Sequence, residues 1–380
     1  MAALGAVLAL AGTSCHRHKH AAPDLAASQE PDRLLFEKSL EDIKNKRFEV
    51  ARLTLQTLIN AYPDSDYLDR AKLAIADSWY EQGGSTGLGQ AEIEYKDFIT
   101  FFPNSPHAAY AQYQAAMCHY RRLEKPDRDR SNARRAEREF QLLLKNFAES
   151  EYTTDGSLKL KEVQELLAES DYRVGRFYFI KQSYVAAASR LEELVAKYPN
   201  YSRLDEAVWM VARSFEKMGL PNPERAALYY ARLLTEHPLS EHAGGAKEQL
   251  AALGKPVPEP TPEALARAQQ QKELLEQYER GLMGKMFGMF SGKPFTARAH
   301  AMLGEPVLDT AERKPPPRTA EEVEAQRKIL VERMAASNPN VARNKEEKNE
   351  ENGGSKPKDP GTEKEGGKKK SFLRALIPFW

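Results

Sequence analysis

The hydrophobic positions between residues 32 and 253 recur at helical spacing, in blocks that end at short turns. In one block, Ala187, Leu191, Leu194 and Val195 fall on a single stripe of a helix with about 3.6 residues per turn. Most blocks end at an aromatic residue followed by proline, and proline cannot continue a helix. The pattern therefore predicts an all-α chain in which amphipathic helices alternate with turns.

The turns belong to a repeat, because an alanine precedes each of them at a constant distance. The spacings between successive alanines are 40, 45, 51 and 39 residues, against about 34 for a tetratricopeptide repeat. Gly175, Tyr178, Tyr184 and Ala187 match the Gly/Ala, Tyr, Tyr, Ala pattern of that repeat. We therefore predict five tetratricopeptide-like helix hairpins, stacked as a superhelical solenoid over residues 32–253. The turns are 62–65, 102–105, 147–150, 198–200 and 237–240, and the alanines are Ala51, Ala91, Ala136, Ala187 and Ala226.

The extra length of the repeats is expected in insertions. The glycine-rich residues 83–89, residues 125–130 and residues 221–223 are predicted to widen loops between the helices of the second, third and fifth repeats. Residues 156–181 are predicted to form one unusually long first helix in the fourth. The Asn, Asp or Ser after each turn is expected to cap the helix that follows.

Stacked repeats of this kind bury their core only against their neighbours and line a concave face with their first helices. Such solenoids bind peptides and partner proteins. The register places side chains of the second and fifth repeats on this face, although each of them also fits a solvated helix surface. The candidate partner-binding residues are Arg70, Asp77, Tyr80 and Glu81, then Glu206, Trp209, Arg213 and Lys217, and Arg203, which follows the fourth turn, is a further possible contact.

The first fourteen residues resemble the signal peptide of a bacterial lipoprotein. An apolar run, Met1 to Leu10, leads through small residues to Cys15, the expected lipidation site, and 15–31 form a tether. The match departs from the family pattern in having Gly12 where leucine is usual and in lacking a basic start. A cytosolic chain with a frayed, alanine-rich end is the alternative. The histidines at 16, 18 and 20 alternate with Arg17 and Lys19, which repel a cation, so we expect no metal site there.

Four segments resemble the BamD family, and the similarity covers roughly residues 33–252. They are Tyr95 to Ile99, Ala109 to Tyr113, Arg128 to Ser131 and Val174 to Tyr178. The chain differs in having Ala148 at the third turn and a long C-terminal region.

The resemblance implies a lipid-anchored protein on the periplasmic face of the outer membrane, which assembles β-barrel proteins with the barrel insertase BamA. Its amino-terminal repeats would read the aromatic-ended signal of unfolded barrel precursors, and its later repeats would dock to periplasmic domains of BamA. Other assembly lipoproteins are possible partners.

The region after the repeats is expected to have four parts. Residues 254–262 form a proline-rich hinge, 263–336 a helical extension, 337–370 a disordered polar tail, and 371–380 an apolar aromatic terminal peptide. The Met/Phe cluster at 282–290 fits either a lipid or partner surface or a helix packed on the last repeat. The terminal peptide fits a docking motif for a groove or a membrane, or a tail without a partner.

Charge and motif content argue against several other classes of protein. The chain has 56 basic and 55 acidic residues, so its net charge of +1 gives no field that would attract nucleic acid. It has no phosphate-binding glycine loop, paired-cysteine metal motif or nucleophile elbow, and neighbouring Cys118 and His119 point about 100° apart on a helix. We expect no enzyme activity, cofactor or metal. The alternative function is a periplasmic tetratricopeptide adaptor for cell-wall or cell-division enzymes, and a hydrolase in the C-terminal region is disfavoured.

Overall fold

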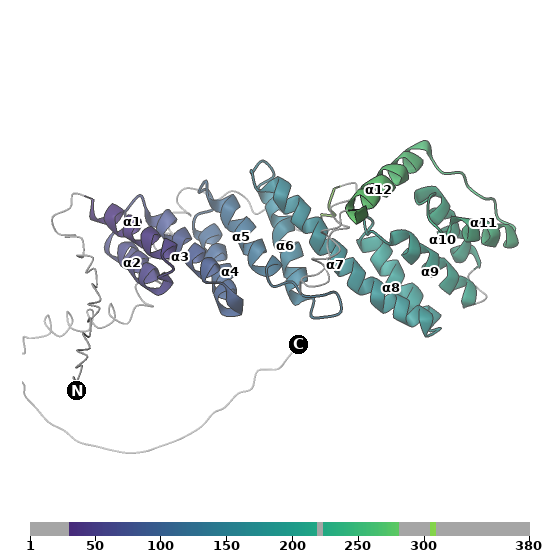
Figure 1. Ribbon diagram of the computed structural model, residues 1–380, viewed down its shortest axis with the longest axis horizontal. Helices are drawn as coiled ribbons and strands as arrows, with labels where there is room; N and C mark the ends of the chain where they lie inside the picture. Colours follow the sequence, from purple (N-terminus) through teal and green to yellow (C-terminus); the bar gives the residue numbers. More distant parts are fainter. Residues whose placement is uncertain (1–29, 219–222, 281–304, 309–380) are drawn as a thin grey trace, which may run out of the picture. The chain divides into compact units, whose positions relative to one another are not determined.

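The computed structural model describes residues 30–218, 223–280 and 305–308 (Figure 1). These residues form twelve α-helices and contain no β-strand, which confirms the predicted all-α fold class. The helices are α1 (Pro31–Lys44), α2 (Phe48–Ala61), α3 (Leu68–Gln82), α4 (Gly84–Phe101), α5 (Ala108–Tyr120), α6 (Ser131–Asn146), α7 (Thr153–Ile180), α8 (Tyr184–Lys197), α9 (Leu204–Lys217), α10 (Pro223–Glu236), α11 (Ala243–Ala252) and α12 (Pro262–Arg280).

Several expectations lie outside the described residues. They are the signal peptide, lipidation at Cys15, the histidine tract, nearly all of the tether, the helical extension beyond 280 apart from 305–308, the Met/Phe cluster, the polar tail and the terminal peptide.

The helices pack in the order of the sequence, each against the next, from α1 to α11 (Figure 1). The pairs α1/α2, α3/α4, α5/α6, α7/α8 and α9/α10 are the five predicted hairpins. The first helices also contact one another, α1 with α3, α5 with α7 and α7 with α9. This nearest-neighbour packing is that of a tetratricopeptide-like solenoid, as predicted, and it places successive first helices side by side.

Small residues let the helices of each hairpin approach closely. The five alanines that define the repeat are all fully buried. A Cβ atom on Gly175 of α7 would lie only 2.5 Å from the Leu191 side chain of α8. Tyr198, the aromatic residue that ends α8, is 3% exposed. The predicted roles of the small residues and of this turn aromatic are confirmed.

The turns are linked to the preceding repeat by a serine. Ser65 donates a hydrogen bond to Asp32 on the first turn of α1, at 2.6 Å, and accepts one from the Tyr67 amide at 3.1 Å. The predicted side-chain caps of the next helices were wrong, because the hydroxyl accepts from the residue just before the helix and not from the first turn. The same pairing joins Ser105 to Asp69 and Ser240 to Asp205.

The glycine-rich residues 83–89 do not widen a loop, contrary to the prediction. α3 ends at Gln82 and α4 begins at Gly84, so Gly83 alone joins them. Gly83 and Gly84 have φ angles of 71° and 68°, a region that residues with a Cβ rarely adopt, and the chain therefore reverses within one turn. The remaining glycines extend the start of α4.

The predictions of a long connection in the third repeat and of a long first helix in the fourth agree with the structure. Residues 121–130 connect α5 to α6, and α7 is a single helix of 28 residues. α12 matches the helical pattern predicted from 263 onwards. None of the described helices is both long and apolar enough to cross a membrane.

Candidate partner-binding site

The candidate residues lie on the first helices of the second and fifth hairpins. α3 carries Arg70, Asp77, Tyr80 and Glu81, and α9 carries Glu206, Trp209, Arg213 and Lys217, with Arg203 directly before α9. The central residues of each set are half-buried, whereas Arg70, Glu81 and Lys217 are exposed. The structure therefore divides the candidates into two clusters with separate surroundings.

The first cluster is a row of tyrosine rings that crosses three repeats, which we call the tyrosine row. Tyr80, Tyr95 and Tyr110 follow one another edge to face, with ring centroids 6.4 Å apart at each step. Tyr152 continues the row at 5.7 Å from Tyr110 and stacks on Tyr113 at 5.3 Å. Ring pairs at these separations attract one another beyond their burial. Tyr95 is fully buried, whereas the other four rings are half-buried and offer partly exposed surfaces at the junctions of three successive hairpins.

Asp77 fixes the middle of the tyrosine row. Its Oδ1 accepts hydrogen bonds from the hydroxyls of Tyr95, at 2.6 Å, and Tyr110, at 3.0 Å. Burial raises the pKa of Asp77, while these two hydrogen bonds act in the opposite direction. The nearby charge of exposed Glu81 raises the pKa further. Asp77 is thus a positioning carboxylate that holds two rings.

One arginine side chain, that of Arg121, covers the α3 end of the tyrosine row. The Arg121 guanidinium lies over the Tyr80 ring, 4.7 Å from its centroid, and donates to the Tyr80 carbonyl at 3.3 Å. Arg70 lies elsewhere, over Phe36 at 4.8 Å and Tyr67 at 5.3 Å. The prediction grouped Arg70 with Asp77 and Tyr80, but the guanidinium of Arg70 lies over rings of α1 and of the turn before α3.

The second cluster, which we call the arginine–aromatic cluster, is centred on Trp209. The Trp209 ring stacks on His242 at 5.2 Å with an interplanar angle of 4° and packs on Tyr230 at 5.5 Å. The Arg213 guanidinium lies 5.6 Å from the Trp209 ring and binds Glu216 at 2.8 Å. The cluster joins α9, α10 and the start of α11.

Arg203 belongs to the same side of α9 and ties it to α7. It donates to the Tyr172 hydroxyl at 2.7 Å and to Glu206 at 2.6 Å, and its guanidinium lies 4.2 Å from the Tyr172 ring. Burial lowers its pKa, but the hydrogen bond with Glu206 and the nearby charges outweigh this and raise it. Lys217 is exposed at the end of α9. The structure thus gives Arg203 a larger role than the sequence suggested.

The sequence analysis missed most partners of these residues. Tyr95, Tyr110 and Tyr113 lie in segments that carry the family resemblance, whereas the register of the single repeats pointed to neither Arg121 nor Tyr152. A signal was present, because Tyr67 and Tyr152 each stand two residues after the turn serine, at Ser65 and Ser150. Tyr67 packs on Phe36, and Tyr152 packs on Tyr110 and Tyr113, so each of these turn tyrosines contacts aromatic rings of the preceding repeat, which a single-repeat register does not reveal.

The described residues contain no metal-ligand cluster, and their free cysteine is not activated. Within the described ranges, no group of three or more histidine, cysteine and acidic residues is placed to hold a metal ion. Cys118 is fully buried, and burial raises the pKa of its thiol to about 12, so it is not a reactive thiolate at neutral pH. His119 contacts Glu92 at 3.0 Å, on another helix. The chemistry available is that of a binding surface.

The sequence is similar to those of a known family of outer membrane proteins. The family model YfiO, described as an outer membrane lipoprotein, matches residues 28–230. The chain is 24% identical to the outer membrane protein assembly factor BamD of Haemophilus influenzae over 196 residues, 49% of this chain and 74% of the relative. It is 23% identical to the BamD of Caulobacter vibrioides over 218 residues, which is 57% of this chain and 70% of the relative. It is 24% identical to the BamD of Pasteurella multocida over 225 residues, which is 57% of this chain and 83% of the relative. Because the family model covers more than half of the chain, the chain belongs to the YfiO/BamD family of outer membrane lipoproteins.

Proposed function

We propose that the chain is a lipid-anchored subunit of the machinery that assembles and inserts β-barrel proteins into the outer membrane. The observation that carries this proposal is the match of the family model across residues 28–230, which takes in most of the helical repeats. The relatives are named as outer membrane protein assembly factors. The chain would be anchored through Cys15, face the periplasm and act without catalysis.

Within this function, the tyrosine row is proposed to receive unfolded barrel precursors. Ring faces and edges suit an aromatic-ended peptide, because aromatic pairs gain energy beyond their buried area. Arg121 donates to a neutral carbonyl, at 3.3 Å, so its charge is available to a peptide carboxylate. The arginine–aromatic cluster is proposed to dock the barrel insertase, since tryptophan and arginine are enriched among the residues that dominate protein interfaces.

The assembly function is tested with the full chain carrying an affinity tag, purified from detergent-solubilised envelopes. We expect mass spectrometry to find a large β-barrel protein with periplasmic repeats in the eluate and an acylated Cys15 at the amino terminus of the bait. An unmodified bait that brings down murein enzymes would overturn the proposal in favour of the adaptor alternative.

The binding faces are tested with the photo-crosslinking amino acid p-benzoylphenylalanine at single positions of the full chain. At Tyr80 it should capture barrel precursors, and at Trp209 the insertase. Leu53 on α2 and Leu228 on α10, which are 70% and 65% exposed, are matched controls on second helices. Equal capture from Leu53 and Tyr80, or from Leu228 and Trp209, would contradict the assignment of that face.

A further inference from the structure

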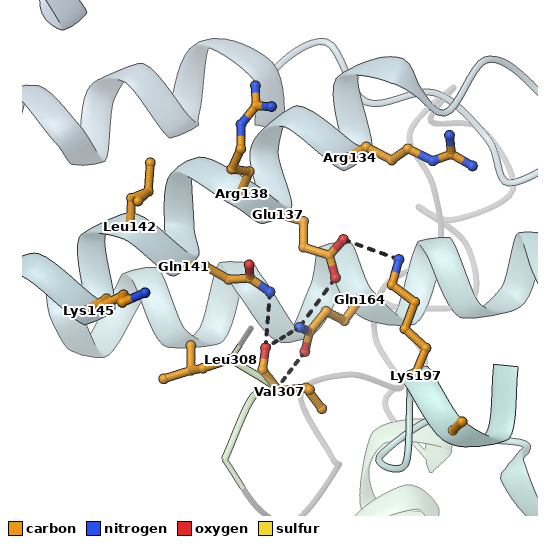
Figure 2. A pocket seen from close by; sticks show the side chains of 11 residues that line it. Arg134, Glu137, Arg138, Gln141, Leu142, Lys145, Gln164, Lys197, Val307 and Leu308 are labelled. Carbon is orange, nitrogen blue, oxygen red and sulfur yellow. Dashed lines mark hydrogen bonds and ion pairs between the residues drawn. The ribbon is translucent and has the colours of Figure 1, made fainter. Parts of the chain in front are cut away.

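Residues 305–308 lie against the middle of the repeats, far from them in sequence. They contact side chains of α6 and α7, as Figure 2 shows for Val307. They also contact Asn200 in the turn after α8. Val307 and Leu308 form part of the wall of a cavity of about 480 Å³ that α6, α7 and α8 also line. The segment thus lies over a groove between three helices and closes one side of the cavity that remains.

Gln164 on α7 pairs with the backbone of this segment through both ends of its carboxamide. Its Nε2 donates to the Val307 carbonyl at 2.7 Å, and its Oε1 accepts the Val307 amide at 3.1 Å, as Figure 2 shows. A carboxamide has the donor and acceptor of a peptide group, so this two-point contact resembles the pairing of two strands. The two hydrogen bonds recognise the peptide backbone of Val307 and not its side chain.

Neighbouring contacts hold the same segment in place. Gln141 of α6 donates to the Val307 carbonyl at 3.3 Å, and Asn200 donates to the Glu305 carbonyl at 2.8 Å. Pro306 is buried and has no amide that would need a partner. Three backbone groups of this short segment, the Glu305 carbonyl and the amide and carbonyl of Val307, are therefore matched to amide side chains from three parts of the repeats.

The docked segment supplies Gln164 with its shortest hydrogen bonds. With the segment in place Gln164 is 8% exposed, and its contact with Glu137 Oε1 within the repeats is longer, at 3.4 Å. Removing a hydrogen-bond partner from a buried amide destabilises a fold, because the amide then has neither that partner nor water. The Val307 backbone supplies an acceptor at 2.7 Å and a donor at 3.1 Å, so the segment and the groove stabilise each other.

We propose that the groove between α6, α7 and α8 is a binding site for an extended peptide, occupied by residues 305–308 of the same chain through the Gln164 carboxamide. The docked segment fixes one point of the long C-terminal region on the third and fourth repeats. This inference does not depend on the proposed assembly function.

The first test is hydrogen exchange of residues 305–308 in the full chain. We expect Gln164→Ala and Gln164→Glu to speed exchange of this segment about tenfold, as the loss of a buried hydrogen bond predicts. Glutamate keeps the acceptor but loses the donor to the Val307 carbonyl. Gln90→Ala on α4 is the matched control and should leave the exchange unchanged. Unchanged exchange in both Gln164 variants would overturn the proposal.

The second test leaves the groove intact and alters the segment. In the full chain, Val307→Pro removes the backbone amide that donates to Gln164 Oε1 and should release the segment. The freed groove should then bind a synthetic peptide with the sequence of residues 303–310. Adding Gln164→Ala should abolish this binding, and a peptide with an N-methylated amide at the Val307 position should not bind. The proposal fails if the Val307→Pro chain does not bind the peptide or if Gln164→Ala makes no difference.

Dilution distinguishes the same chain from a second copy. A segment docked in its own chain keeps its exchange protection at every protein concentration. Protection that falls on dilution would assign the segment to a second copy and overturn the intramolecular proposal.

Discussion

Glu92 is the centre of a buried polar network between α4, α5 and α6. It binds Lys96 Nζ at 2.8 Å, His119 Nε2 at 3.0 Å and Arg122 at 3.4 Å, and its side chain is 15% exposed. Lys96 also binds Glu139 at 2.8 Å. Burial raises the pKa of Glu92, but the hydrogen bonds from His119 and Lys96 outweigh burial and lower the pKa to about 2 from its ordinary 4.5. The ionised form is therefore favoured by folding.

This shift predicts a defined acid dependence of stability. A carboxyl group with a lowered pKa in the folded state contributes stability above about pH 4.5, and that contribution is lost as the pH falls to about 2. The shift corresponds to about 3 kcal/mol at neutral pH. Glu92→Gln should lower the free energy of unfolding at pH 7 and flatten its decline between these pH values, measured by urea unfolding. Glu37→Gln, in an exposed ion pair with Arg33, is the control and should change little.

Gly175 tests the close contact between α7 and α8. A Cβ atom there would lie 2.5 Å from Leu191, whereas one on Gly244 of α11 would have no neighbour within 4 Å. Gly175→Ala should be destabilising, because overpacking costs about 1–3 kcal/mol and exceeds the roughly 1 kcal/mol that alanine gains over glycine in a helix. Gly244→Ala should leave the melting temperature unchanged or raise it. A Gly175→Ala protein that melts no lower than Gly244→Ala would contradict the predicted clash.

At the scale of elements, the turn between α3 and α4 depends on two glycines with positive φ, of which Gly83 has the more restrictive backbone conformation. Gly83 has φ 71° and ψ −158°, a combination that is essentially confined to glycine. Gly83→Ala should cost about 1–3 kcal/mol of stability. Gly89→Ala is the matched control, because Gly89 lies within α4, its Cβ would be 3.9 Å from Arg122, and its backbone needs no positive φ. The melting temperatures of the two variants are measured by calorimetry, and Gly83→Ala should melt at the lower temperature. Equal melting temperatures would show that the turn tolerates a side chain.

The elements were predictable to the extent that their signals are local. Helix periodicity and the alanine-to-turn spacing indicated the hairpins, and the long apolar pattern from 156 onwards indicated α7. The start of α4 was not predicted, because glycines favour loops on average, and only the packing of Leu88 and the turn at Gly83 reveals a helix there. The turn serines were assigned to caps because their partners, Asp32, Asp69 and Asp205, are more than 30 residues away.

The candidate site was less predictable than the fold. The register placed Asp77, Tyr80, Trp209 and Arg213 on first helices, and the structure keeps them there. The tyrosine row, however, is assembled from consecutive repeats, and its rings come from first helices, a second helix and a turn. A pattern within one repeat cannot indicate which residues meet at a junction, so Tyr152 and Arg121 remained hidden. The docking of 305–308 carries no local signal at all.

At the scale of the whole molecule, stability should be divided among the repeats. Each helix packs chiefly against its neighbours in the sequence, so an array of this kind approximates a sum of local and nearest-neighbour energies. The buried core of α3 to α5 and that of α5 to α11 are separate clusters of contacting residues. A perturbation at one end is therefore expected to stay local.

Two buried phenylalanines, one in the first repeat and one in the third, test how far a local loss of stability spreads along the repeats. Phe36 of α1 is 4% exposed and packs on Tyr67 at 5.2 Å, whereas Phe140 of α6 is fully buried between Tyr113 and Tyr120. Either substitution by alanine removes about 3–5 kcal/mol of packing. Phe36→Ala should accelerate hydrogen exchange in α1 to α3 and leave α9 and α10 unchanged. Phe140→Ala should accelerate exchange on both sides, because α6 joins the third hairpin to the fourth. If Phe36→Ala accelerates exchange in α9 as strongly as in α1, the repeats unfold as one cooperative unit and the nearest-neighbour description is wrong.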